Sequence, residues 1–267
     1  MTLTIGSLFS GIGGLELGLE RAGLGPILWQ CEIDPFCRRV LAKRWPTVTR
    51  FDDVTRPRNY PHVDVICGGF PCQDVSSAGA RRGIGGQKSS LWWHYADVIR
   101  QVRPRFAVVE NVASGQKLWL PHVRHQLHML GYGTRAIALS AADVGAPHIR
   151  RRVFVVADSH GVQLRQQQRR SEGRAKTTIA SRDGEARRLD GDANREGEPA
   201  LQLDGQVAGV RGVAADAPAW PLAPELRGVG DGIPNRMDRL RTLGNAVVPQ
   251  CAEVIGYMIR LSGKKDA

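Results

Sequence analysis

The feature that most constrains the fold is a repeated alternation of short apolar runs with stretches of helical spacing. Residues 4–9 predict a strand, residues 11–14 predict a tight glycine turn, and Leu15, Leu19 and Ala22 then fall on one helical face. Further strand-like runs follow at residues 27–32, 63–69, 106–111, near 134–139 and at 152–157. Repeated strand–helix units of this kind predict an α/β fold with a doubly wound sheet.

Composition places the chain among ordinary globular proteins. Its 267 residues are 42% hydrophobic, which is enough to bury a sizeable core. No apolar run is long enough to cross a bilayer, and the N-terminus lacks the basic start and cleavage pattern of a signal peptide. We therefore expect no membrane contact and a cytoplasmic location. The five cysteines are scattered without zinc-ligand spacing, so we expect neither a disulfide framework nor a metal site.

The charge balance narrows the choice of partner. The formal net charge is +11 and the isoelectric point is about 10.0. A small protein this basic usually binds a polyanion, and nucleic acid is the first candidate. The alternative is a basic surface that serves only solubility.

Composition changes near residue 158. From there to about residue 216 the chain is rich in Gln, Arg, Gly, Asp and Ala, and it has neither strand nor helix periodicity. Such a stretch predicts a solvated, partly disordered segment. An amphipathic helical pattern returns at residues 249–261. We therefore divide the chain into a first domain at 1–157, a variable region at 158–233 and a C-terminal segment at 234–267.

Several polar and glycine residues follow the predicted strands. The first strand leads into a glycine turn, the second ends at Glu32, the third opens into a loop containing Cys72, and the fourth ends at Glu110 and Asn111. Ligands of doubly wound sheets bind beyond the carboxyl ends of the strands, so these groups should converge on one rim. The combination predicts a nucleoside-containing cofactor beside a nucleophile. Each element alone has a plainer explanation, such as a packing turn, a helix-capping acid or an inert cysteine.

Five ordered motifs carry a family resemblance. They are the runs Phe9-Ser10-Gly11-Ile12-Gly13-Gly14, Phe70-Pro71-Cys72-Gln73, Glu110-Asn111-Val112, His148-Ile149-Arg150-Arg151-Arg152 and Gly244-Asn245-Ala246-Val247-Val248-Pro249. Together they resemble the cytosine-5 DNA methyltransferase family of bacteria and phages. The resemblance implies a Rossmann-like sheet that binds S-adenosyl-L-methionine, with a small, partly irregular target-recognition region at 158–233. It also implies that the segment at 234–267 returns to the catalytic domain.

The resemblance also implies catalytic roles. The Cys72 thiolate would add to carbon-6 of a flipped cytosine, so that carbon-5 can accept a methyl group. Glu110 would hold or protonate ring nitrogen 3, and Arg152 and Arg150 would contact the base or the active-site loop. Asn111 is expected to brace the loop rather than react.

A cofactor pocket is implied in the same way. Phe9 would lie against the adenine, Gly11 and Gly13 near the methionine portion, and Glu32 at the ribose hydroxyls. Asp53 would take the adenine amino group, with Val54 beside it. The remaining pocket residues would be Ile33, Leu91, Asn245 and Val247. No metal ligand is expected.

The expected partner is double-stranded DNA, bound by a monomer, with a restriction endonuclease as a possible genetic partner. The glycine- and arginine-rich loop at 76–86 is expected to close over the DNA. Two motif positions depart from the family pattern, because Ser7 stands where many members have an acid and His148 replaces a glutamine. Two alternatives stay open: a methyltransferase acting on transfer RNA, and a non-catalytic DNA-binding protein on the same fold.

Overall fold

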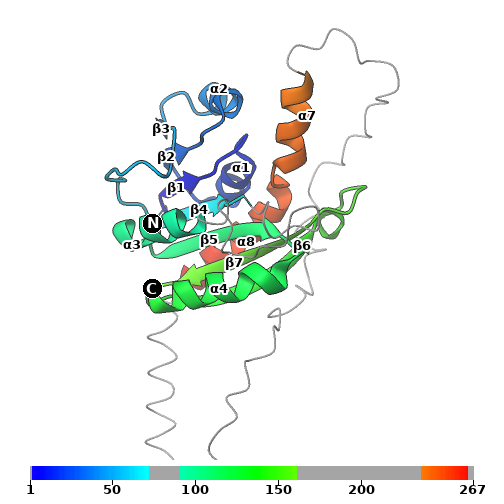
Figure 1. The fold of residues 1–267 in the computed structure, drawn as a ribbon. Coiled ribbons are helices and arrows are strands. Elements are labelled where there is room, and N and C mark those ends of the chain that lie inside the picture. The colour runs from blue at the N-terminus through cyan, green and yellow to red at the C-terminus, as the bar shows by residue number, and fades with distance from the viewer. Residues whose placement is uncertain (1, 72–90, 161–235, 264–267) are drawn as a thin grey trace, which may run out of the picture.

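The computed structural model describes residues 2–71, 91–160 and 236–263. Their centre is a twisted sheet in the order β3-β2-β1-β4-β5-β7-β6 (Figure 1). Its strands are β1 (Ile5–Leu8), β2 (Ile27–Cys31), β3 (Thr49–Phe51), β4 (Val65–Gly69), β5 (Phe106–Val112), β6 (Gly133–Ser140) and β7 (Arg151–Asp158). β1 pairs in parallel with both β2 and β4, so the strand order reverses at the centre of the sheet. The predicted α/β, doubly wound fold is confirmed.

Strand β7 runs opposite to its neighbours β5 and β6. The link from Ser140 to Arg151 contains only a short 3₁₀ turn, η2 (Ala141–Val144). A parallel return needs a crossover of about a dozen residues or more, usually a helix, so this short link favours an antiparallel pair. β7 therefore begins at the edge where β5 ends, and Arg152 pairs in register with Val112.

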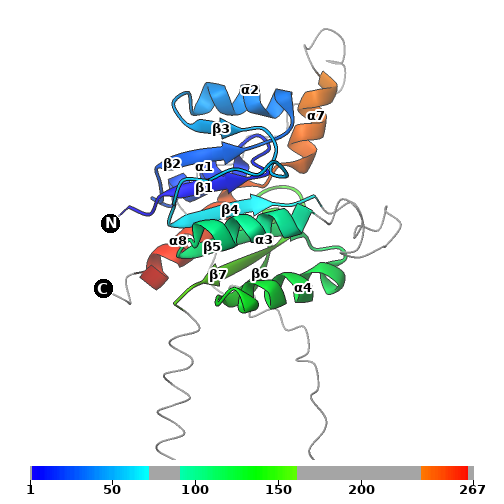
Figure 2. The same ribbon diagram turned by 60° about the vertical axis from the view of Figure 1, so that its left-hand side comes forward.

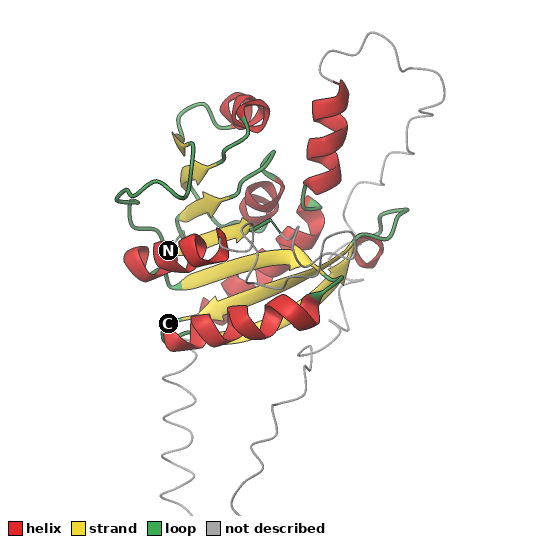
Figure 3. Cartoon of the chain, in the orientation of Figure 1, coloured by secondary structure: helices red, strands yellow, loops and turns green. Residues whose placement is uncertain are grey.

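Helices cover both faces of the sheet (Figures 2 and 3). One face carries α3 (Leu91–Val102) and α4 (Gln116–Met129), and their core includes Trp92 and Trp119. The other face carries α1 (Gly14–Arg21), α2 (Pro35–Arg44) and α8 (Pro249–Gly263), whose core includes Leu19 and Ile255. Strands buried on both faces explain the continuous apolar runs of the sequence.

Local sequence explains where α2 and α3 form. Asp34 caps α2 by accepting hydrogen bonds from the backbone N–H groups of Phe36 and Cys37, and Pro35 occupies the first turn. In α3, Trp92, Tyr95 and Ile99 recur at helical spacing and are buried. None of the described helices is both long and apolar enough to span a bilayer.

The C-terminal helix α8 packs against α1, at the other end of the sequence. The contact is close, because a Cβ added at Gly18 would overlap the carbonyl oxygen of Pro249 and lie 2.5 Å from the Cβ of Ala252. Arg260 donates a hydrogen bond of 2.7 Å to the carbonyl of Ala22. Before α8, helix α7 (Arg236–Asn245) stands beyond the carboxyl ends of the parallel strands (Figure 1).

Candidate active site

A cavity of about 530 Å³ lies at the carboxyl ends of the parallel strands. Its walls come from the glycine turn after β1, the ends of β2, β4 and β5, and the segment that joins α7 to α8. The predicted site residues that line it are Phe9, Gly11, Glu32, Ile33, Asp53, Val54, Leu91, Glu110, Arg152, Asn245 and Val247. The topology thus brings together residues that are far apart in sequence.

The turn after β1 has an unusual backbone. Phe9 has a φ of 53°, Gly11 a φ of 56° and Gly13 a φ of 86°, all in the left-handed region. Glycine adopts such angles at little cost, whereas a phenylalanine there is strained. At Gly14 a side chain is excluded because a Cβ would meet the carbonyl oxygen of Val247. The turn is therefore narrow, and it holds the α7–α8 connection directly against the start of α1.

Glu32 has both carboxylate oxygens engaged by the backbone. Gly11 N–H donates to Oε2 at 2.7 Å, and Asp34 N–H donates to Oε1 at 2.8 Å. Burial raises the pKa of this carboxyl, while the two backbone donors oppose the shift. The hydrogen bonds fix Glu32 at the end of β2, between the glycine turn and the start of α2.

Glu110 and Arg152 form an ion pair on the opposite side of the cavity. Arg152 Nε lies 2.9 Å from Glu110 Oε1. Burial raises the pKa of Glu110 to about 7, although Arg152 and Arg150 act in the opposite direction. The neighbouring Asn111 donates from Nδ2 to the carbonyl of Phe70 at 3.2 Å, which ties the end of β5 to the segment after β4. This acid can therefore exchange a proton near neutral pH.

Glu16, which was not among the predicted site residues, also lines the 530 Å³ cavity. It lies in the first turn of α1 and is completely buried. Its position beside the apolar Leu15 gives no signal of burial, but the polar Ser7 and Gln30 inside otherwise apolar strands do indicate a buried polar cluster. Arg241 of α7 was not predicted either; it forms an ion pair with Asp34 at 2.6 Å and joins α7 to the start of α2.

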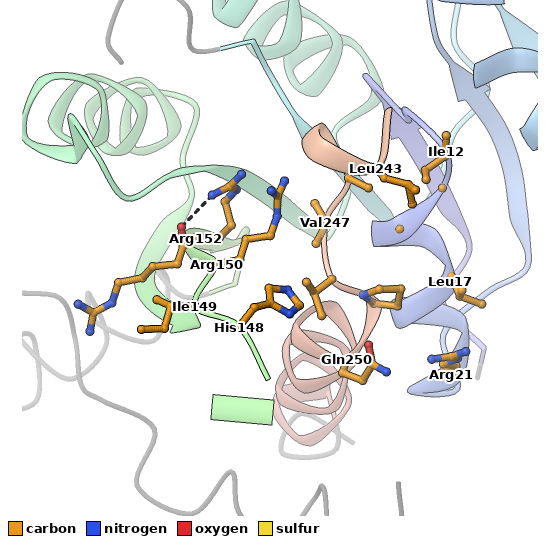
Figure 4. A pocket seen from close by; sticks show the side chains of 16 residues that line it. Ile12, Leu17, Arg21, His148, Ile149, Arg150, Arg152, Leu243, Val247 and Gln250 are labelled. Carbon is orange, nitrogen blue, oxygen red and sulfur yellow. Dashed lines mark hydrogen bonds between the residues drawn. The ribbon is translucent and has the colours of Figure 1, made fainter. Parts of the chain in front are cut away.

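A second cavity, of about 730 Å³, adjoins the first. Figure 4 shows Arg150 and Arg152 on one side of it, Ile12, Leu17 and Arg21 on the other, and Val247 between them. Arg150 and Gly13 line this second cavity and not the first, whereas Arg152 and Val247 line both. The guanidinium of Arg150 is partly buried, with Nε and Nη2 lacking a hydrogen-bond partner.

Four cysteines belong to the described residues, and all four are buried. Burial raises the pKa of Cys31 to about 11, and raises those of Cys37 and Cys251 to about 12. The pKa of Cys67 is also raised well above its ordinary value by burial. Cys31 and Cys67 lie in the core, as expected from their apolar strands. The predicted nucleophile Cys72, the loop at 76–86 and residues 161–233 of the variable region lie outside the described residues.

Comparison with known proteins identifies the family. The family model for C-5 cytosine-specific DNA methylases matches residues 3–197, which is more than half of the chain. The chain belongs to this methylase family. Type II methyltransferase M2.BsuMI of Bacillus subtilis is 37% identical over 159 residues, covering 57% of this chain and 41% of the relative. Type II methyltransferase M1.HphI of Haemophilus parahaemolyticus is 34% identical over 182 residues, covering 61% of this chain and 48% of the relative.

A solved structure supports the same relationship. It is a putative DNA modification methyltransferase encoded within an Escherichia coli prophage, with 28% identity and a TM-score of 0.51. The match covers 61% of this methylase-family chain and 48% of that protein. In each of these three matches the chain spans less than half the length of the relative. Residues 3–197, which the family model matches, include all seven described strands but end before Asn245 and Val247 of the cavity.

Proposed function

We propose that this chain transfers a methyl group from S-adenosyl-L-methionine to carbon-5 of cytosine in DNA, through a covalent Cys72 adduct on a flipped base. The observation that carries the proposal is the shared cavity of Glu32 and Glu110. One end has a carboxylate suited to ribose hydroxyls, and the other has a buried acid–arginine pair suited to a pyrimidine edge. Family membership supports the reaction class.

The cavity fits the cofactor in size and chemistry. Its volume of about 530 Å³ falls within the range of roughly 300 to 1,000 Å³ that is usual for ligand pockets. Glu32 would accept hydrogen bonds from the ribose hydroxyls, and Asp53 and Val54 would contact the adenine together with Phe9. Ile33, Leu91, Asn245 and Val247 would complete the pocket around these groups. When bound, S-adenosyl-L-methionine supplies an electrophilic methyl group.

The residues at the other end would activate the cytosine. The Cys72 thiolate would add to carbon-6, which moves electron density toward carbon-5 and ring nitrogen 3. Protonated Glu110 would donate a hydrogen bond to nitrogen 3, and Arg152, held beside it, would contact the base. After methylation, loss of the carbon-5 proton and departure of the thiolate restore the aromatic ring. A pKa of about 7 gives Glu110 a substantial protonated fraction at neutral pH.

The other cysteines are poor alternatives to Cys72. A nucleophile must be a thiolate, and burial raises the pKa of each of the four described thiols. A thiol with a pKa of about 11 or 12 is almost fully protonated at neutral pH. These values support Cys72 as the reactive thiol.

The proposed macromolecular partner is duplex DNA, which the chain would bind as a monomer. The net charge of +11 favours a polyanion. The matched relatives include proteins named type II methyltransferases, so a restriction endonuclease is the proposed genetic partner. Residues 158–233 are the proposed target-recognition region.

The decisive test compares substrates and traps the adduct. Purified protein is incubated with labelled S-adenosyl-L-methionine and either duplex DNA or transfer RNA, and label in carbon-5 of cytosine is measured. Duplex DNA containing 5-fluorocytosine is tested in parallel for a covalent complex, with Cys72→Ser as the matched control.

We expect methylation of DNA and an adduct that is absent in the Cys72→Ser variant. Methylation of transfer RNA alone would replace DNA by RNA as the substrate. Cofactor binding without methylation or adduct would favour a non-catalytic DNA-binding protein. Mapping methylated cytosines in DNA from expressing cells would then give the target sequence.

A further inference from the structure

Glu16 is a completely buried carboxyl group in the wall of the 530 Å³ cavity. It projects from the first turn of α1, directly after the glycine turn that closes the end of β1. Its Oε1 accepts a hydrogen bond of 3.4 Å from Nε2 of Gln30, but its Oε2 has no hydrogen-bond partner. An unpartnered buried carboxylate oxygen is costly unless another group satisfies it.

The described residues around Glu16 are polar, and none of them is a cation. Ser7 and Ser10 face it from β1 and the turn, Gln30 faces it from β2, and Cys67 faces it from β4. Ser10 donates a hydrogen bond of 2.9 Å to Oγ of Ser7. Within residues 2–71, 91–160 and 236–263, Glu16 forms no salt bridge. Burial raises the pKa of Glu16, while the Ser7 and Ser10 hydroxyls and the Gln30 amide oppose the shift.

Glu16 differs in this respect from the other buried acids of the cavity. Both oxygens of Glu32 are held by backbone N–H groups, and Glu110 is paired with Arg152. Among these three acids, only Glu16 has a buried carboxylate oxygen that lacks a hydrogen-bond partner within the described residues. It is also placed at the N-terminal end of α1, where the helix dipole favours a negative charge.

The strand order indicates which part of a ligand would reach Glu16. β1 lies between β2, which carries Glu32, and β4, which is followed by β5 with Glu110. A cofactor with its ribose at Glu32 and its reactive methyl directed toward Glu110 has its amino-acid portion near the turn after β1. That portion carries an ammonium group, which is a cation with three hydrogen-bond donors.

We propose that Glu16 is the counter-ion of the α-ammonium group of the cofactor, with Oε2 accepting a hydrogen bond from it. The inference rests on the proposed use of S-adenosyl-L-methionine. The bound ammonium group would lower the pKa of Glu16 and favour its ionised form, and a proton released in this way would leave for the solvent. The glycine turn, which also holds the α7–α8 connection against α1, would bring the first turn of α1 within reach of the ligand.

The test uses Glu16→Gln, which keeps the size of the side chain but cannot carry a negative charge. Glu20→Gln is the matched control: Glu20 lies one turn later on α1, accepts hydrogen bonds of 3.0 Å from Trp45 Nε1 and does not line the cavity. Calorimetry measures the affinity of each protein for S-adenosylhomocysteine and for its analogue in which hydrogen replaces the amino group. Circular dichroism and thermal unfolding verify that each variant is folded.

We expect Glu16→Gln to weaken S-adenosylhomocysteine binding about 10- to 100-fold, the effect of losing a charge-assisted hydrogen bond. Its affinity for the deaminated analogue should stay within about threefold of the wild type, and Glu20→Gln should resemble the wild type with both ligands. Wild-type binding of S-adenosylhomocysteine should also release more protons than binding of the analogue, as measured in two buffers of different ionisation enthalpy.

Equal weakening of both ligands in Glu16→Gln, or no weakening of either, would overturn the role of Glu16 and leave the proposed function intact. If Glu16→Gln does not fold, the wild-type comparison decides: equal affinity and equal proton release for the two ligands would refute the inference. Failure of the wild type to bind either ligand would refute the proposed cofactor itself.

Discussion

At the scale of single residues, the Glu110–Arg152 pair is the group proposed to contact the base. Burial raises the pKa of Glu110, and the two arginines lower it, but burial has the larger effect and the pKa is about 7. A fully exposed glutamate would be ionised at neutral pH and would accept rather than donate a hydrogen bond. Burial at the end of a strand therefore gives this acid a pKa suited to the proton-donor role proposed for it.

Replacement of Glu110 by Gln tests this proton donor. We expect single-turnover methylation to slow by about 100- to 1,000-fold, because Gln cannot transfer a proton to ring nitrogen 3. Affinity for S-adenosylhomocysteine should change little, since Glu32 and the glycine turn lie at the other end of the cavity. Loss of cofactor affinity equal to the loss of rate would contradict this division of the site.

The raised pKa of Glu110 also predicts a dependence of stability on pH. Between its ordinary value of 4.5 and about 7, the folded protein holds a proton that the unfolded chain has lost. The contribution of Glu110 to the free energy of unfolding is therefore fully present below about 4.5, decreases as pH rises, and is lost above about 7. Urea unfolding at several pH values should give a smaller decline for Glu110→Gln than for the wild type. Parallel pH profiles for the two proteins would refute the prediction.

At the scale of elements, the contact between α1 and α8 holds the cavity together. It brings the α7–α8 connection, with Asn245 and Val247, against the glycine turn. Gly18 is the position of close approach between the two helices. The shape of the 530 Å³ cavity thus depends on the packing of α8 against α1 on one face of the sheet.

Substitution of Gly18 by Ala should separate the helices. A methyl group there would overlap Pro249 and press against Ala252. Overpacking costs about 1 to 3 kcal/mol, which exceeds the gain of about 1 kcal/mol from the better helix propensity of alanine. We expect a lower free energy of unfolding and weaker S-adenosylhomocysteine binding. The control is Gly244→Ala, where a Cβ meets no atom within 4 Å, and it should leave both measurements nearly unchanged. Equal effects of the two substitutions would exclude helix separation as the cause.

Most elements at the cavity could be predicted from the sequence. The apolar runs of β1, β2, β4 and β5 are buried on both faces, so their ends could be located and the acids that follow them could be assigned to one rim. The short edge strand β3 was not predicted, because it has only three residues, none of them fully buried. The direction of β7 depends on the length of its connection rather than on its composition.

Individual side-chain environments were harder to predict. Glu32 and Glu110 follow apolar strands, which makes each of them conspicuous. Glu16 and Glu20 both lie on α1 among leucines, yet one is completely buried in the cavity wall and the other pairs with Trp45. Only the packing of the helix on the sheet distinguishes the two.

At the scale of the whole molecule, the positive net charge is the property that most affects binding to a polyanion. The chain has 37 Lys and Arg residues against 26 Asp and Glu residues. Such an excess attracts the phosphate backbone whatever the base sequence, and each neutralised phosphate releases counterions. Charge would therefore account for a general affinity for the proposed DNA partner, while selection of a particular cytosine would require contacts to bases.

The binding of duplex DNA without a target site should therefore depend steeply on salt. We expect the affinity, measured by fluorescence anisotropy, to fall at least about tenfold between roughly 50 and 200 mM salt. A DNA of unrelated sequence serves as the control and should show a similar slope. Affinity that is insensitive to salt would refute binding through the phosphates.

The return of α8 to α1 also has a consequence for biosynthesis. Gly11 and Glu32 leave the ribosome early, but Asn245, Val247 and the helix that holds them against α1 are made more than 200 residues later. The pocket wall cannot close on a partial chain. If this cavity holds the cofactor as proposed, translation must pass Val247 before the cofactor can be held, and the proposed methylation of DNA would begin only after that point.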